Sequence, residues 1–63
     1  MFTDMFIIKD ENGNWVNEFT DVAKVNSFIA QKGWSKILSD RKHVMLFTDK
    51  EGTKYSMECF ETN

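Results

Sequence analysis

One segment of the chain follows a helical period, whereas the apolar runs on either side of it are short. Its apolar residues recur three and four positions apart, as on one face of an amphipathic helix: Val22, Val25, Phe28 and Ile29. Thr20 and Asp21 precede the segment, where a hydroxyl can cap free N–H groups and an acid meets the positive end of the helix dipole. Gly33 suits a left-handed C-terminal cap. The pattern predicts a helix over residues 21–32.

Five short apolar or alternating runs predict strands separated by turns. They cover residues 2–10, 14–19, 34–39, 43–48 and 53–60. Asn12-Gly13 predicts a two-residue type I′ hairpin turn, because both central positions need positive φ. Asp49-Lys50-Glu51-Gly52 predicts a type I turn closed by a glycine in a G1 bulge. The resulting order, ββαβββ, predicts one α+β domain over residues 1–63, with one helix packed on a mostly antiparallel sheet.

The two hairpin loops determine which residues face each other and thereby separate the two faces of the sheet. The first loop predicts Phe6 opposite Phe19 and Asp10 opposite Trp15 on one face, and Ile7 opposite Glu18 and Lys9 opposite Val16 on the other. The second loop predicts Phe47 opposite Tyr55, Met45 opposite Met57 and His43 opposite Cys59 on one face, and Leu46 opposite Ser56 and Val44 opposite Glu58 on the other. We expect the more aromatic faces to pack on the helix.

The opposite face keeps more apolar residues than a sheet covered by one helix normally presents to water. Polar residues are expected to form a border around them: Lys9, Glu18, Lys54, Ser56 and Glu58. An apolar centre with a charged border is the anatomy of an interface, although apolar residues on central strands are also ordinary surface. We predict a surface for self-association or for another protein, formed by Met5, Ile7, Val16, Ile37, Val44 and Leu46.

Length and composition limit what the domain can do. A chain of 63 residues has a thin core, and with Cys59 as its single cysteine it has no intramolecular disulfide to stabilise it. The N-terminal region lacks a basic stretch followed by a long apolar run, so we expect no signal peptide, no membrane span and a cytoplasmic or host-cytoplasmic location. A formal charge of −2 gives no overall attraction to nucleic acid.

The charge is unevenly distributed, which leaves a nucleic-acid-binding module as the alternative function. Residues 1–31 hold five acids and two bases, whereas residues 32–54 hold six bases and three acids. Bases could neutralise phosphates while Trp34 and Tyr55 stacked on nucleobases. The candidate bases are Lys36, Arg41, Lys42, Lys50 and Lys54. Asp40, Asp49 and Glu51 interrupt them, and both aromatic residues are needed in the core, which disfavours this alternative.

Catalytic chemistry is nearly absent. His43 and Cys59 form a Cys–His pair in the predicted register, the minimum for a thiol nucleophile, but no orienting group or oxyanion site accompanies them. Cys59 and His43 also leave a zinc site two ligands short. We predict no enzyme, cofactor or metal, but a small interaction or regulatory module, compatible with a phage or mobile-element accessory protein. An inhibitor that competes for a basic cleft would use the acids, which are Asp4, Asp10, Glu11, Glu18, Asp21, Glu58 and Glu61.

Overall fold

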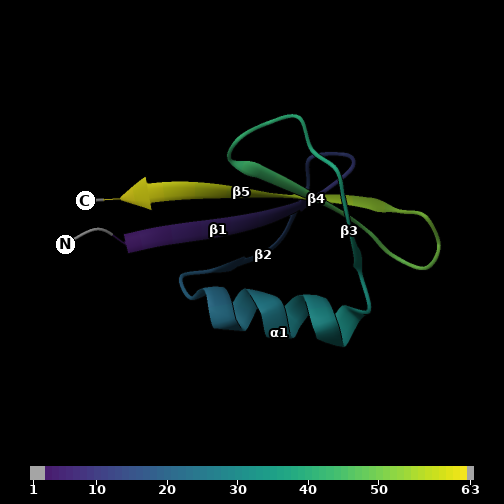
Figure 1. Ribbon diagram of the computed structural model, residues 1–63, viewed down its shortest axis with the longest axis horizontal. Coiled ribbons are helices and arrows are strands. Elements are labelled where there is room, and N and C mark those ends of the chain that lie inside the picture. The colour runs from purple at the N-terminus through teal and green to yellow at the C-terminus, as the bar shows by residue number, and fades with distance from the viewer. Residues whose placement is uncertain (1–2, 63) are drawn as a thin grey trace.

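The computed structural model describes residues 3–62 and contains one helix and one five-stranded antiparallel sheet (Figure 1). The elements are β1 (Thr3–Asp10), β2 (Trp15–Phe19), α1 (Val22–Lys32), β3 (Ser35–Ile37), β4 (Val44–Thr48) and β5 (Lys54–Thr62). This order confirms the predicted ββαβββ α+β fold. Phe2, the first position of the predicted N-terminal strand, lies outside the described residues.

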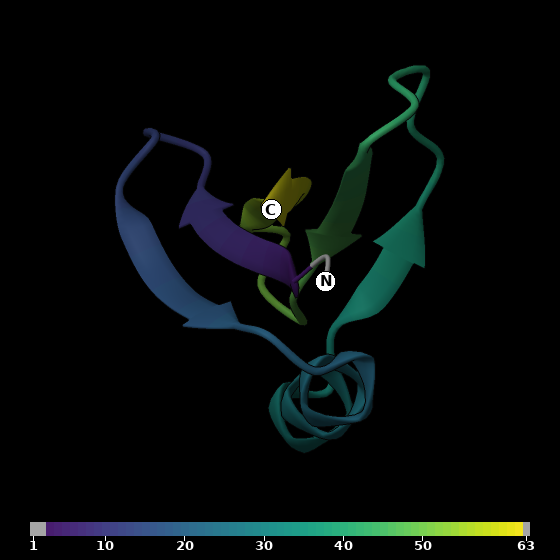
Figure 2. The same cartoon turned by 90° about the vertical axis from the view of Figure 1, so that its left-hand side faces the viewer.

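The sheet has the strand order β2-β1-β5-β4-β3, which places β5 at its centre. The first and last strands, β1 and β5, pair along eight positions, from Thr3 opposite Thr62 to Asp10 opposite Tyr55. Figure 2 shows the sheet curled, with edge strands β2 and β3 on either side of α1. A single helix can therefore cover the concave face of all five strands, while β1, β5 and β4 form the crest of the convex face.

The ends of α1 show which residues cap it. The carboxylate of Asp21 accepts a hydrogen bond of 2.9 Å from the N–H of Ala23, so Asp21, rather than the Thr20 hydroxyl, is the N-cap. Asp21 has an extended backbone and its carboxylate reaches the second helical residue, as an N-cap requires. Gly33, at φ 70°, closes the other end as predicted, with its own N–H and that of Trp34 bonded to carbonyls of the last turn.

The core lies between the helix and the concave face. Its buried residues come from β1, α1, β4 and β5: Phe6, Ile8, Val25, Phe47 and Met57. Half-buried aromatic rings extend it toward the C-terminal end of α1, from Phe19 to Phe28 at 5.3 Å and from Phe28 to Trp34 at 5.4 Å between ring centroids. The prediction that aromatic side chains pack on the helix side is correct for these residues. It is wrong for Trp15, which is 59% exposed.

The first hairpin differs from its prediction at the turn. The N–H of Gly13 donates to the carbonyl of Asp10 and the N–H of Asp10 donates to the carbonyl of Asn14, which makes the loop one residue longer than an Asn-Gly type I′ turn. Lys9 therefore faces Trp15 and not Val16, and the predicted Asp10–Trp15 pair is wrong.

A bulge in β2 then restores the predicted register. The pairing shifts between Ile8 and Lys9, and beyond it Ile7 faces Glu18 and Phe6 faces Phe19, as predicted. Because β2 carries one extra residue at the bulge, Val16 packs against the core and Trp15 lies on the convex face beside Lys9. The predicted placement of Val16 on the convex face is therefore wrong.

The second hairpin confirms its prediction. Val44 faces Glu58, Met45 faces Met57, Leu46 faces Ser56 and Phe47 faces Tyr55. The N–H of Cys59 donates to the carbonyl of His43, which agrees with the predicted pairing of these two residues. In its turn the N–H of Gly52, at φ 88°, donates to the carbonyl of Asp49, and the N–H of Asp49 donates to that of Thr53. This is the predicted type I turn with a G1 bulge.

Candidate binding surfaces

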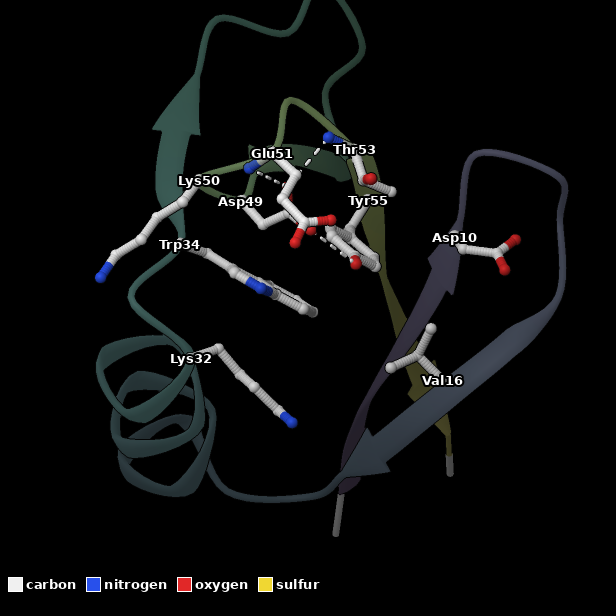
Figure 3. Close-up of a pocket in the computed structure, with 9 residues that line it drawn as sticks. All are labelled: Asp10, Val16, Lys32, Trp34, Asp49, Lys50, Glu51, Thr53 and Tyr55. Atoms are coloured by element: carbon white, nitrogen blue, oxygen red, sulfur yellow. Dashed lines mark hydrogen bonds between the residues drawn. The ribbon is translucent and has the colours of Figure 1, made fainter.

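An open cavity of about 560 Å³ lies where both hairpin turns meet the C-terminal end of α1 (Figure 3). We call it the aromatic cavity; its lining is Asp10, Val16, Lys32, Trp34, Asp49, Lys50, Glu51, Thr53 and Tyr55. The stacked rings of Trp34 and Tyr55 form one wall, with centroids 3.9 Å apart and planes 10° apart. Both rings are only half-buried, so the wall retains surface that a ligand can contact.

Asp49 fixes this wall to the β4–β5 turn. Its Oδ1 accepts hydrogen bonds of 2.9 Å from the N–H groups of Glu51 and Thr53, and its Oδ2 accepts one of 3.0 Å from the hydroxyl of Tyr55. Burial alone would raise the pKa of Asp49, but hydrogen bonding with Thr53, Tyr55, Glu51 and Gly52 outweighs it and lowers the pKa below its ordinary value of 3.8. The carboxylate is therefore committed to holding the turn and Tyr55.

Asp10 has the equivalent position in the β1–β2 turn. Its Oδ1 accepts hydrogen bonds of 2.9 Å from the N–H groups of Asn12 and Asn14. The hydrogen bond from Asn14 is the largest influence on Asp10, and together with that from Asn12 it lowers the pKa below 3.8 despite some burial. Both turns share the spacing Asp-x-x-Gly, in Asp10-Glu11-Asn12-Gly13 and in Asp49-Lys50-Glu51-Gly52. This shared spacing could have predicted that the first turn has the same hydrogen bonds as the second.

The two lysines at the cavity differ in what they contact. The ammonium of Lys32 lies 5.6 Å from the ring centroid of Phe28, in a cation–π contact. Lys50 extends away from Tyr55, whereas Val16 and Trp34 point into the cavity (Figure 3). The side chain of Glu51 reaches toward the aromatic pair from the turn above it.

The outer face, on the convex side of the sheet, gathers most of the predicted partner-binding residues. Met5 and Ile7 lie on it from β1, Val44 and Leu46 from β4, and Ile37 from β3. Val44 is 9% exposed and the other four are half-buried. Ile37 faces Leu46, so the apolar residues of β3 and β4 adjoin one another, whereas Val44 faces Glu58 of β5.

Polar residues of β5 divide this outer face. Lys54, Ser56 and Glu58 alternate along the central strand, between the apolar residues of β4 and those of β1. The prediction that Ser56 and Glu58 belong to a border around the apolar residues is therefore wrong. In the sheet, β5 lies between β1 and β4. The outer face therefore carries two apolar columns, one on β1 and one on β4, with the polar stripe of β5 between them.

Sequence reasoning missed the exposure of four large apolar residues in the described chain, of which Val22, predicted on the apolar face of the helix, is 55% exposed. Leu38, in the loop after β3, is 98% exposed, and Phe60, opposite Met5 on the outer face, is 44% exposed. Trp15 lies on the same face, where its indole N–H donates to the carboxylate of Glu18 at 3.2 Å. Continuing the alternation of β5 past Glu58 would have placed Phe60 outward, whereas nothing in the sequence marks the bulge that exposes Trp15.

The structure does not gather the five candidate nucleic-acid-binding bases on one surface. Arg41 and Lys42 lie in the loop before β4, whereas Lys50 lies in the turn after it. Lys54 belongs to the outer face, and Lys36 faces the helix side opposite Phe47. Trp34 and Tyr55 stack on each other rather than forming a separate exposed platform.

The sequence pairs His43 with Cys59, and in the structure the backbone N–H of Cys59 donates to the carbonyl of His43. His43 is exposed, while the side chain of Cys59 packs against the core. Within residues 3–62 no group of three or more metal-ligating side chains is placed to hold an ion. No helix in the described part of the chain has the length and apolarity to cross a membrane.

Comparison with known proteins adds no relative: no protein-family model, curated protein or solved structure matches the chain. Its function therefore has to be inferred from the aromatic cavity and the outer face.

Proposed function

We propose that the protein is a non-enzymatic interaction module that self-associates as a two-fold dimer through its outer face. The observation that carries the proposal is the charge sequence along the central strand. Lys54, Ser56 and Glu58 follow one another on the outer face of β5, with a base, a neutral residue and an acid at equal spacing. Such a stripe is complementary to its own reversed copy.

A two-fold axis through Ser56, lying in the interface and perpendicular to β5, makes the two central strands antiparallel. Lys54 then lies opposite Glu58 of the second copy, and Glu58 lies opposite Lys54 of that copy. An axis along the strand would instead oppose Lys54 to Lys54, with repulsion between like charges. Charge complementarity thus selects one arrangement, and an isologous contact is closed, so it ends at the dimer.

The apolar columns beside the stripe supply the favourable free energy in this arrangement. Each column packs on its own copy, Leu46 on one side of β5 and Met5 and Ile7 on the other, while Val44 is already buried in the monomer and adds little area. Burial contributes about 25 cal/mol per Å² of apolar area, which is large for a domain with a thin core. The columns lie on β1 and β4, which flank β5 in the middle of the sheet (Figure 2).

Charge reversal tests the arrangement directly. We expect a dimer mass for the unmodified chain in light scattering, a shift to monomer for Lys54→Glu and for Glu58→Lys, and recovery of the dimer in the double variant. Lys24→Glu changes an exposed helix residue by the same charge and should leave the mass unchanged. A monomeric unmodified chain at high concentration, or single variants that both remain dimeric, would refute the proposal.

A further inference from the structure

The aromatic cavity is a second candidate site, independent of the outer face. Its volume of about 560 Å³ lies within the range of ordinary ligand pockets. The aromatic wall is held rigid, because Trp34 stacks on Tyr55 and Tyr55 is hydrogen-bonded to Asp49. A preformed aromatic wall requires no ordering when a planar group stacks on it, which lowers the entropic cost of binding.

Negative charge predominates where the wall meets the turns. Three acidic and two basic residues contribute to the lining: Asp10, Asp49, Glu51, Lys32 and Lys50. The charged groups of Asp10 and Lys50 point away from the aromatic pair (Figure 3). The charges of Asp49, Asp10 and Glu51 all raise the pKa of Tyr55, after burial and its hydrogen bond to Asp49, so all three act on its hydroxyl. An anionic ligand would be repelled here, whereas a cation would be attracted.

Among the described residues, neither lysine of the lining makes a cation–π contact with Trp34 or Tyr55. Lys32 contacts the ring of Phe28, and Lys50 extends away from Tyr55 (Figure 3). Asp49 is occupied by three donors, but Glu51 reaches toward the aromatic pair from an exposed turn position. A cation beside Trp34 and Tyr55 would therefore meet aromatic surface on one side and the carboxylate of Glu51 on another.

We infer that the aromatic cavity binds the guanidinium group of an arginine side chain in a peptide, which stacks on an outward face of the Trp34–Tyr55 pair with Glu51 as its carboxylate partner. A guanidinium is planar, stacks on aromatic rings and forms two parallel hydrogen bonds with a carboxylate, whereas an ammonium group is a compact and strongly hydrated charge. The open mouth of the cavity admits a side chain that remains attached to a peptide backbone.

The test follows the indole N–H of Trp34 by NMR during titration with N-acetyl-arginine amide. N-acetyl-citrulline amide has nearly the same shape without the charge, which makes it the matched control probe. We expect saturable shifts of the Trp34 signal with the arginine probe and none with the citrulline probe. Equal shifts with both probes, or saturable shifts confined to residues outside the cavity, would overturn the inference.

Substitutions in the lining test which charged side chain attracts the arginine probe. Glu51→Gln should weaken binding of the arginine probe by about threefold to tenfold, as expected for loss of one partly exposed charge-assisted contact. Lys50→Gln should strengthen it, because a competing cation is removed from the rim. Glu11→Gln alters an exposed turn carboxylate outside the cavity and should have no effect. Unchanged affinity in both cavity variants would overturn the inference, and NMR spectra of each variant verify its fold.

Discussion

Tyr55 donates a hydrogen bond of 3.0 Å to Asp49, six residues earlier in the chain. The same carboxylate also accepts the N–H groups of Glu51 and Thr53, so one side chain holds both the β4–β5 turn and the stacked wall of the aromatic cavity. The geometry of the cavity therefore depends on the ionisation of both partners: Asp49 has to be charged and Tyr55 has to be protonated.

Acid should loosen this turn. The hydrogen bonds lower the pKa of Asp49 in the folded chain below 3.8, so the unfolded chain binds the proton more readily. The resulting stabilisation is present above pH of about 4 and is lost as the pH falls through the folded value. Thermal unfolding followed by circular dichroism from pH 7 to pH 2 should show this loss, and Asp49→Asn should be less stable at pH 7 with a shallower acid dependence. An unchanged profile in Asp49→Asn would show that other carboxylates dominate, of which Asp10 is the first to replace.

High pH should break the same hydrogen bond by removing the proton of Tyr55. Burial and the hydrogen bond to Asp49 raise the pKa of Tyr55 above 10.0, so its contribution to stability is complete below pH of about 10 and is lost as the pH rises through the folded value. Tyr55→Phe keeps the stacked ring but removes the ionisable group. We expect the variant to lose stability less steeply above pH of about 10 than the unmodified chain, measured by thermal unfolding followed by circular dichroism at each pH. A steeper loss than in the unmodified chain would contradict this interpretation.

The core depends most on Ile8. It is the one side chain fully buried among the described residues, with 0% exposure, and it lies on β1 between β2 and β5. Ile8→Ala leaves a cavity that the surrounding strands can only partly close, which costs about 2–5 kcal/mol. Chemical denaturation should show this loss, and for a domain of this size it is enough to unfold much of the population. Val22→Ala, at an exposed position of α1, is the matched control and should change stability by less than about 1 kcal/mol.

Local patterns predicted most of the fold, and they did so because each element carries its own boundary signals. Gly33 ends the helix and Gly52 closes the second hairpin in the predicted conformations. The strand order could not be predicted in the same way, since the pairing of β1 with β5 joins the two ends of the chain and no local signal specifies it. That pairing is also what places Ser56 and Glu58 in the middle of the outer face, so the candidate surface could be predicted only in part.

Two errors in the first hairpin cancelled. The turn after Asp10 contains one residue more than an Asn-Gly turn requires, and the bulge in β2 takes up one residue, so the pairing of Phe6 with Phe19 is correct although the residues between are misplaced. The turn chemistry was misread because Asn-Gly has the strongest preference for type I′ turns, whereas the carboxylate of Asp10 stabilises the longer loop through two N–H groups.

Because of the bulge in β2, we expect the same substitution to have different effects on stability at two adjacent residues. Val16 packs against the core, whereas Trp15 is on the outer face with 59% exposure. Val16→Lys should therefore destabilise the fold by about 1–3 kcal/mol, since it removes the packing of Val16 against the core and places an ammonium group beside it. Trp15→Lys should change the free energy of unfolding by less than about 1 kcal/mol, because the exposed ring contributes little to the core. Denaturant unfolding of the two variants compares them on the same strand and with the same introduced side chain.

If Trp15→Lys proved the more destabilising, the alternation without a bulge would hold, with Trp15 on the helix side and Val16 outside. Trp15 would then have to pack beside Phe19 in the core, and the lysine at position 16 would be an ordinary surface residue.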